Sequence, residues 1–176
     1  PEGAGRPDSL SHGLLVHYPF NGNAQDESGN GKHPTTHRHT LTQDRFGNED
    51  RARLFGDPMY IGLEEFGKVF PRQLTQAAWV NPDSRGIPAR NGHIVLFTKR
   101  HVDSSVTDNG QDWLTLSLYP YGNALHPALI LDDYNRMVEL RPLSPLSYGE
   151  WSHVCGVKDE NVFTLYLNGR NVLTRT

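Results

Sequence analysis

The sequence contains little that would support a disulfide-stabilised, membrane-spanning or nucleic-acid-binding protein. Its 176 residues include one cysteine, Cys155, so no internal disulfide can form. It has no run of about eighteen apolar residues, so we expect no membrane-spanning helix and no membrane insertion. The formal net charge is −3 and no basic stripe occurs, so we expect no nucleic-acid partner.

Glycine and proline are plentiful, with 17 and 12 residues, and such a load suits short strands joined by tight turns. In 113–119, Leu114, Leu116 and Leu118 alternate with polar or aromatic residues, as in a strand with one buried face. The predicted strands are 14–20, 51–55, 59–63, 74–80, 93–100, 113–119, 128–133, 136–141, 151–158 and 162–168. The dipeptide Asn168-Gly169 predicts a tight hairpin and a return strand after it. One short segment, 64–70, is compatible with a helical turn.

This run of strands predicts an all-β fold with two antiparallel sheets packed as a sandwich or barrel. The length favours one domain. Residues 1–12 are rich in glycine, proline and charge, so we interpret them as a linker and place the domain at 13–176. Because the first residue is Pro1, we expect an excerpt or a processed chain.

Several segments, in a fixed order, carry a family resemblance. They are GLLVHYPFNGNAQDESGNG (13–31), LTQDRFGNED (41–50), ARLFGDPMYI (52–61), LTQAAWVNP (74–82), FTKR (97–100) followed by LTLSLY (114–119), and WSHVCGVKDENVFTLYLNG (151–169). In these segments the chain resembles the laminin-G-like, concanavalin A-like jelly-roll domains of large extracellular bacterial proteins. The resemblance implies a jelly-roll sandwich, a secreted or cell-surface location, and other domains of a parent protein as neighbours.

The chain departs from this family at three places. Gln76 stands where the family has a core aliphatic residue, so its polar side chain must find a partner. Cys155 replaces a small residue, which we interpret as neutral packing. Family members continue past the Asn-Gly hairpin with two further strands, whereas this sequence stops at Thr176, so we expect the C-terminal strands of the jelly roll to be missing.

The segment YPFNGNAQDESGNG (18–31) is unusually polar and rich in glycine. Asn21, Asp26, Ser28 and Asn30 offer the hard oxygen atoms that Ca²⁺ prefers, and the resemblance favours a structural Ca²⁺ near the end of the first strand. The spacing is not that of an EF-hand. The alternative is a connection whose Asp and Asn side chains bond their own backbone.

The chain lacks the motifs of common catalytic sites. The resemblance raises the possibility of a glycoside-active enzyme domain, but jelly-roll glycosidases place carboxylates on one strand as Glu-x-Asp-x-x-Glu, and no Glu-x-Asp occurs here. Asp132 and Asp133 are adjacent, so they would point to opposite faces of a strand. No G-x-S-x-G, Walker or G-x-G-x-x-G motif is present, so we predict that the chain is not an enzyme.

Aromatic and polar residues gather on and around strand 113–119 and predict a sugar-binding face. We expect Trp113 and Tyr121 to stack on sugar rings, Asp132 and Asn135 to bond sugar hydroxyls, and Arg100 to contact a sugar carboxylate. Trp79 and Trp151 are expected to pack in the core.

The sequence therefore predicts a non-catalytic module of a larger secreted protein that binds carbohydrate or another cell-surface ligand. The main alternative is a structural spacer or adhesion domain without a small ligand.

Overall fold

The structure, a computed structural model, describes a chain made of strands. It covers residues 12–37, 40–54, 60–62, 72–83, 94–102, 111–133 and 136–176, with the backbone alone at 35–37, 60–62, 98–102, 111–113, 133 and 136. These residues form twelve strands and no helix, so the predicted all-β class is confirmed. The described residues therefore contain no helix long and apolar enough to cross a membrane. The helical turn considered for 64–70 lies outside these residues.

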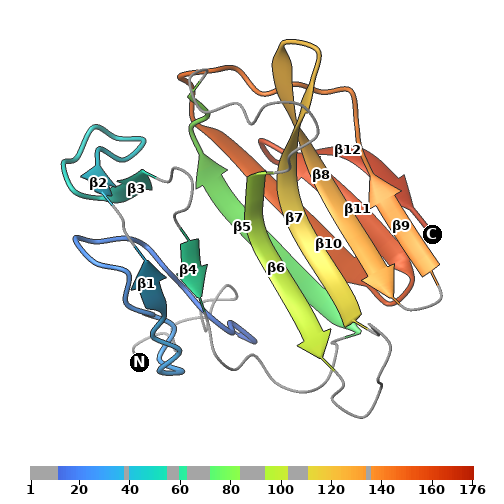
Figure 1. Cartoon of the computed structure of the whole chain (residues 1–176), viewed down its shortest axis with the longest axis horizontal. Coiled ribbons are helices and arrows are strands. Elements are labelled where there is room, and N and C mark those ends of the chain that lie inside the picture. The colour runs from blue at the N-terminus through green and yellow to red at the C-terminus, as the bar shows by residue number, and fades with distance from the viewer. Residues whose placement is uncertain are drawn as a thin grey trace, which may run out of the picture. The chain divides into compact units, whose positions relative to one another are not determined.

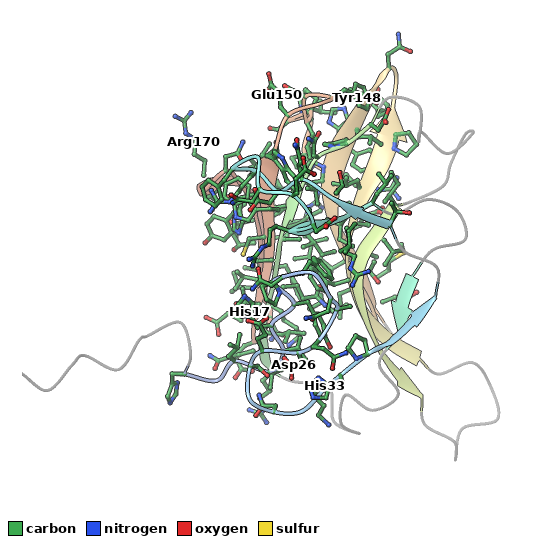
Figure 2. The ribbon with its side chains drawn as sticks, turned by 90° about the vertical axis from the view of Figure 1, so that its left-hand side faces the viewer. His17, Asp26, His33, Tyr148, Glu150 and Arg170 are labelled. Atoms are coloured by element: carbon green, nitrogen blue, oxygen red, sulfur yellow. The ribbon has the colours of Figure 1, made fainter. Side chains whose placement is uncertain are left out.

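The chain divides into two compact units, Pro1–Phe66 and Gly67–Thr176. The second unit is a sandwich of two four-stranded antiparallel sheets, which Figure 2 shows edge-on as two layers. One sheet has the order β12-β11-β10-β5 and the other the order β6-β7-β8-β9 (Figure 1). The strands are β5 (Gln73–Val80), β6 (Ile94–Val102), β7 (Gln111–Tyr121), β8 (Ala124–Asp133), β9 (Arg136–Leu140), β10 (Ser152–Asp159), β11 (Val162–Leu167) and β12 (Arg170–Arg175).

The first unit holds two short antiparallel pairs. Strand β1 (Thr35–His37) pairs with β4 (Tyr60–Gly62), and β2 (Thr40–Thr42) pairs with β3 (Ala52–Leu54). The strand predicted at 14–20 is wrong, because this segment joins no sheet and instead bonds the polar loop that follows it. Its apolar residues suggested a strand, but its backbone bonds the side chains of Asp26 and Asn30 and the backbone N–H of Glu27 instead of another strand.

The predicted strands of the second unit are confirmed within one to four residues at their ends. The hairpin at Asn168-Gly169 is also confirmed, since Asn168 has φ 50° and Gly169 has φ 77°, as a tight turn of this kind requires. Strand β12 lies at the end of its sheet order. The absence of further C-terminal strands of the family stays a prediction.

The core lies between the two sheets of the sandwich. Leu114, Leu116 and Leu118 are all at most 3% exposed and face inward, as their alternation predicted. Leu129 and Leu131 meet them from the neighbouring strand β8. Phe163 and Leu165 pack against them from the other sheet. About 1.5–3 kcal/mol of hydrophobic free energy per fully buried side chain of this size holds the layers together.

Gln76 interrupts this core, as its position in the family pattern predicted. Its Nε2 donates to the carbonyl oxygen of Leu114 across the sandwich at 3.4 Å, which is long for a hydrogen bond. Its Oε1 is buried and has no partner. The side chain has therefore found a partner for its amide nitrogen but none for its amide oxygen.

We expect Gln76→Leu to stabilise the sandwich by about 1 kcal/mol, because it removes a buried acceptor that has no donor. The measurement is urea unfolding followed by tryptophan fluorescence, with Thr75→Leu as the control. Thr75 precedes Gln76 on β5 and is exposed, so the same leucine there gains nothing. A loss of stability with Gln76→Leu would show that the Gln76 amide is better satisfied than this geometry indicates.

Candidate functional site

Three of the predicted sugar-binding residues occupy one row across the sheet β6-β7-β8-β9. Arg100 on β6 is the register partner of Trp113 on β7, and Trp113 is the partner of Asp132 on β8. These positions alternate with Leu114 and Leu131, which face the core, so the row belongs to the outer face of the sheet. Asp132 is exposed there. Residues that are far apart in the sequence thus meet at one end of the sheet.

Tyr121 does not belong to this row. It lies eight residues along β7 from Trp113, a separation of about 26 Å at the usual strand rise. Trp113 and Tyr121 therefore cannot stack on the same sugar ring, and sugar binding by each of them stays a prediction. Asn135, the remaining predicted ligand, lies outside the described residues.

The middle of the outer face is closed to solvent, although the sequence predicted an open polar face. Thr115 is 9% exposed, and Ser117 and Ala128 are both 0% exposed. Tyr119 is also buried, at 6%, and its hydroxyl donates to the carbonyl oxygen of Pro142 at 3.2 Å. The two ends of the face are therefore separate places where a ligand could bind.

A cluster of rings and charges forms at the end of the β7–β8 hairpin. The His126 ring is 5.4 Å from that of Tyr119 and 6.0 Å from that of Tyr121. The Arg141 guanidinium lies 5.1 Å from the centre of the Tyr119 ring and forms an ion pair with Glu139. Burial raises the pKa of Tyr119 above its usual value. Sequence reasoning missed His126 and Arg141, although the tight turn after Tyr121 fixes the register that sets His126 opposite Tyr119.

The position of Trp79 also differs from the one predicted from the sequence. It was expected to pack in the core, but it is 46% exposed and contacts His153 with ring centres 5.2 Å apart. The alternation along β5 could have predicted this exposure. Leu74, Ala78 and Val80 face inward, and Trp79 occupies one of the positions between them that face outward.

The polar loop of the first unit is built around one carboxylate, Asp26, which is 7% exposed. Its Oδ1 accepts the backbone N–H groups of His17 and Ser28, both at 2.9 Å. Its Oδ2 accepts the backbone N–H of Lys32 at 2.9 Å and the hydroxyl of Ser28 at 2.8 Å. The backbone N–H of Asp26 donates to Nδ1 of His33 at 3.3 Å, and Figure 2 shows His17, Asp26 and His33 close together.

These hydrogen bonds determine the pKa of Asp26. Burial alone would raise the pKa of Asp26, but the donors from His17, Ser28 and Lys32 outweigh burial and hold that pKa well below its ordinary value. Tyr18 lies next to this group and donates its hydroxyl to the carbonyl oxygen of Lys32 at 2.7 Å. Burial and the Asp26 charge together raise the pKa of Tyr18 to about 12.

The four predicted calcium ligands have other partners in this arrangement. Both carboxylate oxygens of Asp26 accept protein donors, and one of these donors is the Ser28 hydroxyl. The Asn21 side-chain oxygen accepts from Arg51 at 2.7 Å, which brings a cation to this point. Asn30 donates its amide to the carbonyl oxygen of Leu14 at 2.7 Å. In the described residues no three His, Cys, Asp or Glu side chains are grouped as metal ligands. These hydrogen bonds favour the alternative, a connection whose Asp and Asn side chains bond the backbone.

Calcium binding at Asn21, Asp26, Ser28 and Asn30 stays a prediction that one experiment can decide. From the hydrogen bonds we expect the same melting temperature in calcium and in a chelator. If calcium did bind, a concentration one hundred times its dissociation constant would add about 2.7 kcal/mol to the free energy of unfolding. A calcium-dependent rise that Asp26→Ala removes would support the calcium site.

Comparison with known proteins identifies the fold family. The sequence model described as the concanavalin A-like lectin/glucanases superfamily, a laminin-G-like family, matches residues 56–176. The chain belongs to this family. The matched segment includes the whole of the β-sandwich unit, so the resemblance found in the sequence is confirmed.

One solved structure that is similar to this family member is domain 4 of AbnA, a GH43 extracellular arabinanase from Geobacillus stearothermophilus, in complex with arabinotriose. The two chains share 22% identity with a TM-score of 0.59, and the match covers 93% of this chain and 75% of the other. At this identity the similarity shows the fold alone. No curated protein matches the chain.

Proposed function

We propose that this chain is a non-catalytic glycan-binding module of a larger secreted protein, and that it binds sugar at the row Arg100–Trp113–Asp132. The family and the similar arabinanase domain support carbohydrate binding, but a shared fold does not define a function. The observation that carries the proposal is the register, which sets Arg100, Trp113 and Asp132 at adjacent positions on three neighbouring strands.

This set of residues suits the chemistry of a sugar. An indole ring offers an apolar plane for the C–H groups of a sugar face, and flanking charged groups bond its hydroxyls. Each polar contact gains only about 0.5–1.5 kcal/mol because sugars are well hydrated. A shallow site should therefore bind near the millimolar range, about −4 kcal/mol in total. Such weak sites suit a module tethered in a larger protein, where several act together.

The test is a calorimetric titration of the folded chain with the glycan that it binds best. We expect Trp113→Ala to weaken binding at least tenfold, because it removes the stacking plane, and Asp132→Asn to weaken it less. The control is Met137→Ala, because Met137 is the register partner of Asp132, is 63% exposed and offers no polar contact. Equal affinity for the wild type and Trp113→Ala would contradict binding at this row.

The alternative is a spacer or adhesion domain without a small ligand. The exposed Trp79 favours it in part, because an exposed indole on the second sheet also suits contact with a neighbouring protein domain. The two functions differ in one result, because a spacer binds no glycan even when it is folded. A glycoside-active domain would in addition release reducing sugar from its ligand.

A further inference from the structure

Among the described residues on the outer face of the sheet β6-β7-β8-β9, one buried ring nitrogen has no hydrogen-bond partner. His126 lies on β8, is 5% exposed and has a buried Nδ1 with no partner. Buried polar atoms in proteins almost always have a partner, so one that lacks it calls for an explanation, such as a bound ligand or water. His126 thus marks a place where a hydrogen-bonding group belongs.

An exposed aromatic ring covers the same place. Tyr121 is 63% exposed and approaches the His126 ring edge-on, with an interplanar angle of 79° and ring centres 6.0 Å apart. Both residues lie at the end of the β7–β8 hairpin, which extends beyond the neighbouring strands (Figure 1). Because Tyr121 is mostly in solvent, its ring can adjust its rotamer to a ligand at little cost.

An ion pair lies beside these rings. Among the described residues, Arg141 is the cation that contacts the Tyr119 ring, and its guanidinium is paired with the carboxylate of Glu139. An acidic ligand would have to compete with Glu139, whereas a neutral ligand leaves the ion pair intact. An apolar plane, a ring nitrogen that can donate or accept, and balanced charge together suit an uncharged polyhydroxyl compound.

We propose that Tyr121 and His126 form a second subsite for a neutral sugar unit, separate from the row at Trp113. The tyrosine ring stacks on the sugar, and a sugar hydroxyl bonds the ring nitrogen of His126. The subsite is independent because about 26 Å of strand and the buried residues Ser117 and Ala128 separate it from Trp113. This inference rests on the proposed glycan-binding function.

Two subsites on one face have a consequence for the ligand. A short oligosaccharide occupies either subsite alone, whereas a polysaccharide can reach both and gains avidity from the second contact. Affinity for a polysaccharide that reaches both subsites should therefore exceed the affinity expected from its number of sugar units alone. A variant that has lost either subsite should not show this extra affinity.

The experiment is an NMR titration of the folded chain with five neutral trisaccharides: arabinotriose, xylotriose, cellotriose, mannotriose and galactotriose. The signals followed are the ring C–H groups of His126 and Tyr121 and the indole N–H of Trp113. For at least one sugar we expect saturable shifts at both places, and the shifts at His126 should persist in Trp113→Ala. Tyr121→Ala should abolish the shifts at His126 and leave those at Trp113, while Tyr121→Phe, which keeps the ring, should retain both.

The results that would contradict the second subsite have different consequences for the proposed function. Shifts at Trp113 alone would overturn the second subsite and leave the proposed function standing. Shifts at His126 that vanish in Trp113→Ala would show one coupled site and would also overturn it. No shift at either place with any of the five sugars would overturn both proposals.

Discussion

Replacing Asp26 with asparagine is expected to speed the hydrogen exchange of three backbone amides, those of His17, Ser28 and Lys32, by roughly ten- to hundredfold. All three donate to the Asp26 carboxylate at 2.9 Å. A hydrogen bond to a charged group contributes about 1.5–3 kcal/mol, and each 1.4 kcal/mol corresponds to a factor of ten. Exchange is the sharpest measurement because it reports on this loop and does not depend on how the two units unfold.

The effect should depend on pH in a defined direction. The pKa of Asp26 is lowered in the folded chain, so its stabilisation is fully present above the unfolded pKa of about 3.9 and is lost progressively as pH falls from there through the lower pKa of the folded state. The ratio of exchange rates between variant and wild type at the same pH should therefore shrink toward one well below pH 4.

The control for this prediction is Glu27→Gln. Glu27 is the neighbouring carboxylate, it is exposed, and its side chain makes one long contact with Asn21 at 3.4 Å. Its replacement should leave the three amides unchanged. Equal exchange in Asp26→Asn and the wild type would mean that the carboxylate does not organise the loop.

The second large effect is expected at Gly156, where an added methyl group should destabilise the sandwich by about 1–3 kcal/mol. A Cβ at this position would lie 2.6 Å from Cδ1 of Leu129 and 3.3 Å from Cδ1 of Leu116. Both leucines are 0% exposed in the core, so neither can move aside freely. Urea unfolding of Gly156→Ala, followed by tryptophan fluorescence, measures the loss.

A double-mutant cycle tests whether the loss at Gly156 comes from a steric clash with Leu129. Leu129→Ala alone should cost about 2–5 kcal/mol because it leaves a cavity. In that background Gly156→Ala should cost much less than in the wild type, because the added methyl group fills the space left by Leu129. Strictly additive losses would show that the two side chains do not meet and that the alanine acts through the backbone.

The sandwich could be predicted from the sequence because its signals are local. Alternation placed Leu114, Leu116 and Leu118 in the core, and Asn168-Gly169 placed a hairpin. Alternation alone did not reveal that Ser117 is also buried, because the burial of an outward-facing residue depends on what covers the sheet. Trp79 was misplaced because its strand resembles a core-like strand of the family, whereas alternation along β5 sets this position on the outward-facing side.

The candidate site was predictable in its residue types but not in its geometry. Which of the polar and aromatic residues meet is decided by strand register, and this joins Trp113 to Arg100 and Asp132 and separates it from Tyr121. In the polar loop the composition indicated a group of polar oxygen atoms, but it could not show that the Asp26 carboxylate accepts backbone N–H groups. Such bonds depend on the path of the chain and leave no mark in the composition.

The most direct test of glycan binding is a glycan array probed with the folded chain, with folding shown by a β-sheet circular dichroism spectrum in the same buffer. The array should carry arabinan, xylan and other neutral polysaccharides with their short oligosaccharides. We expect specific retention on at least one neutral glycan, stronger on the polymer than on its trisaccharide, and weakened by Trp113→Ala. No retention of folded wild-type chain on any glycan would contradict the account and favour the spacer.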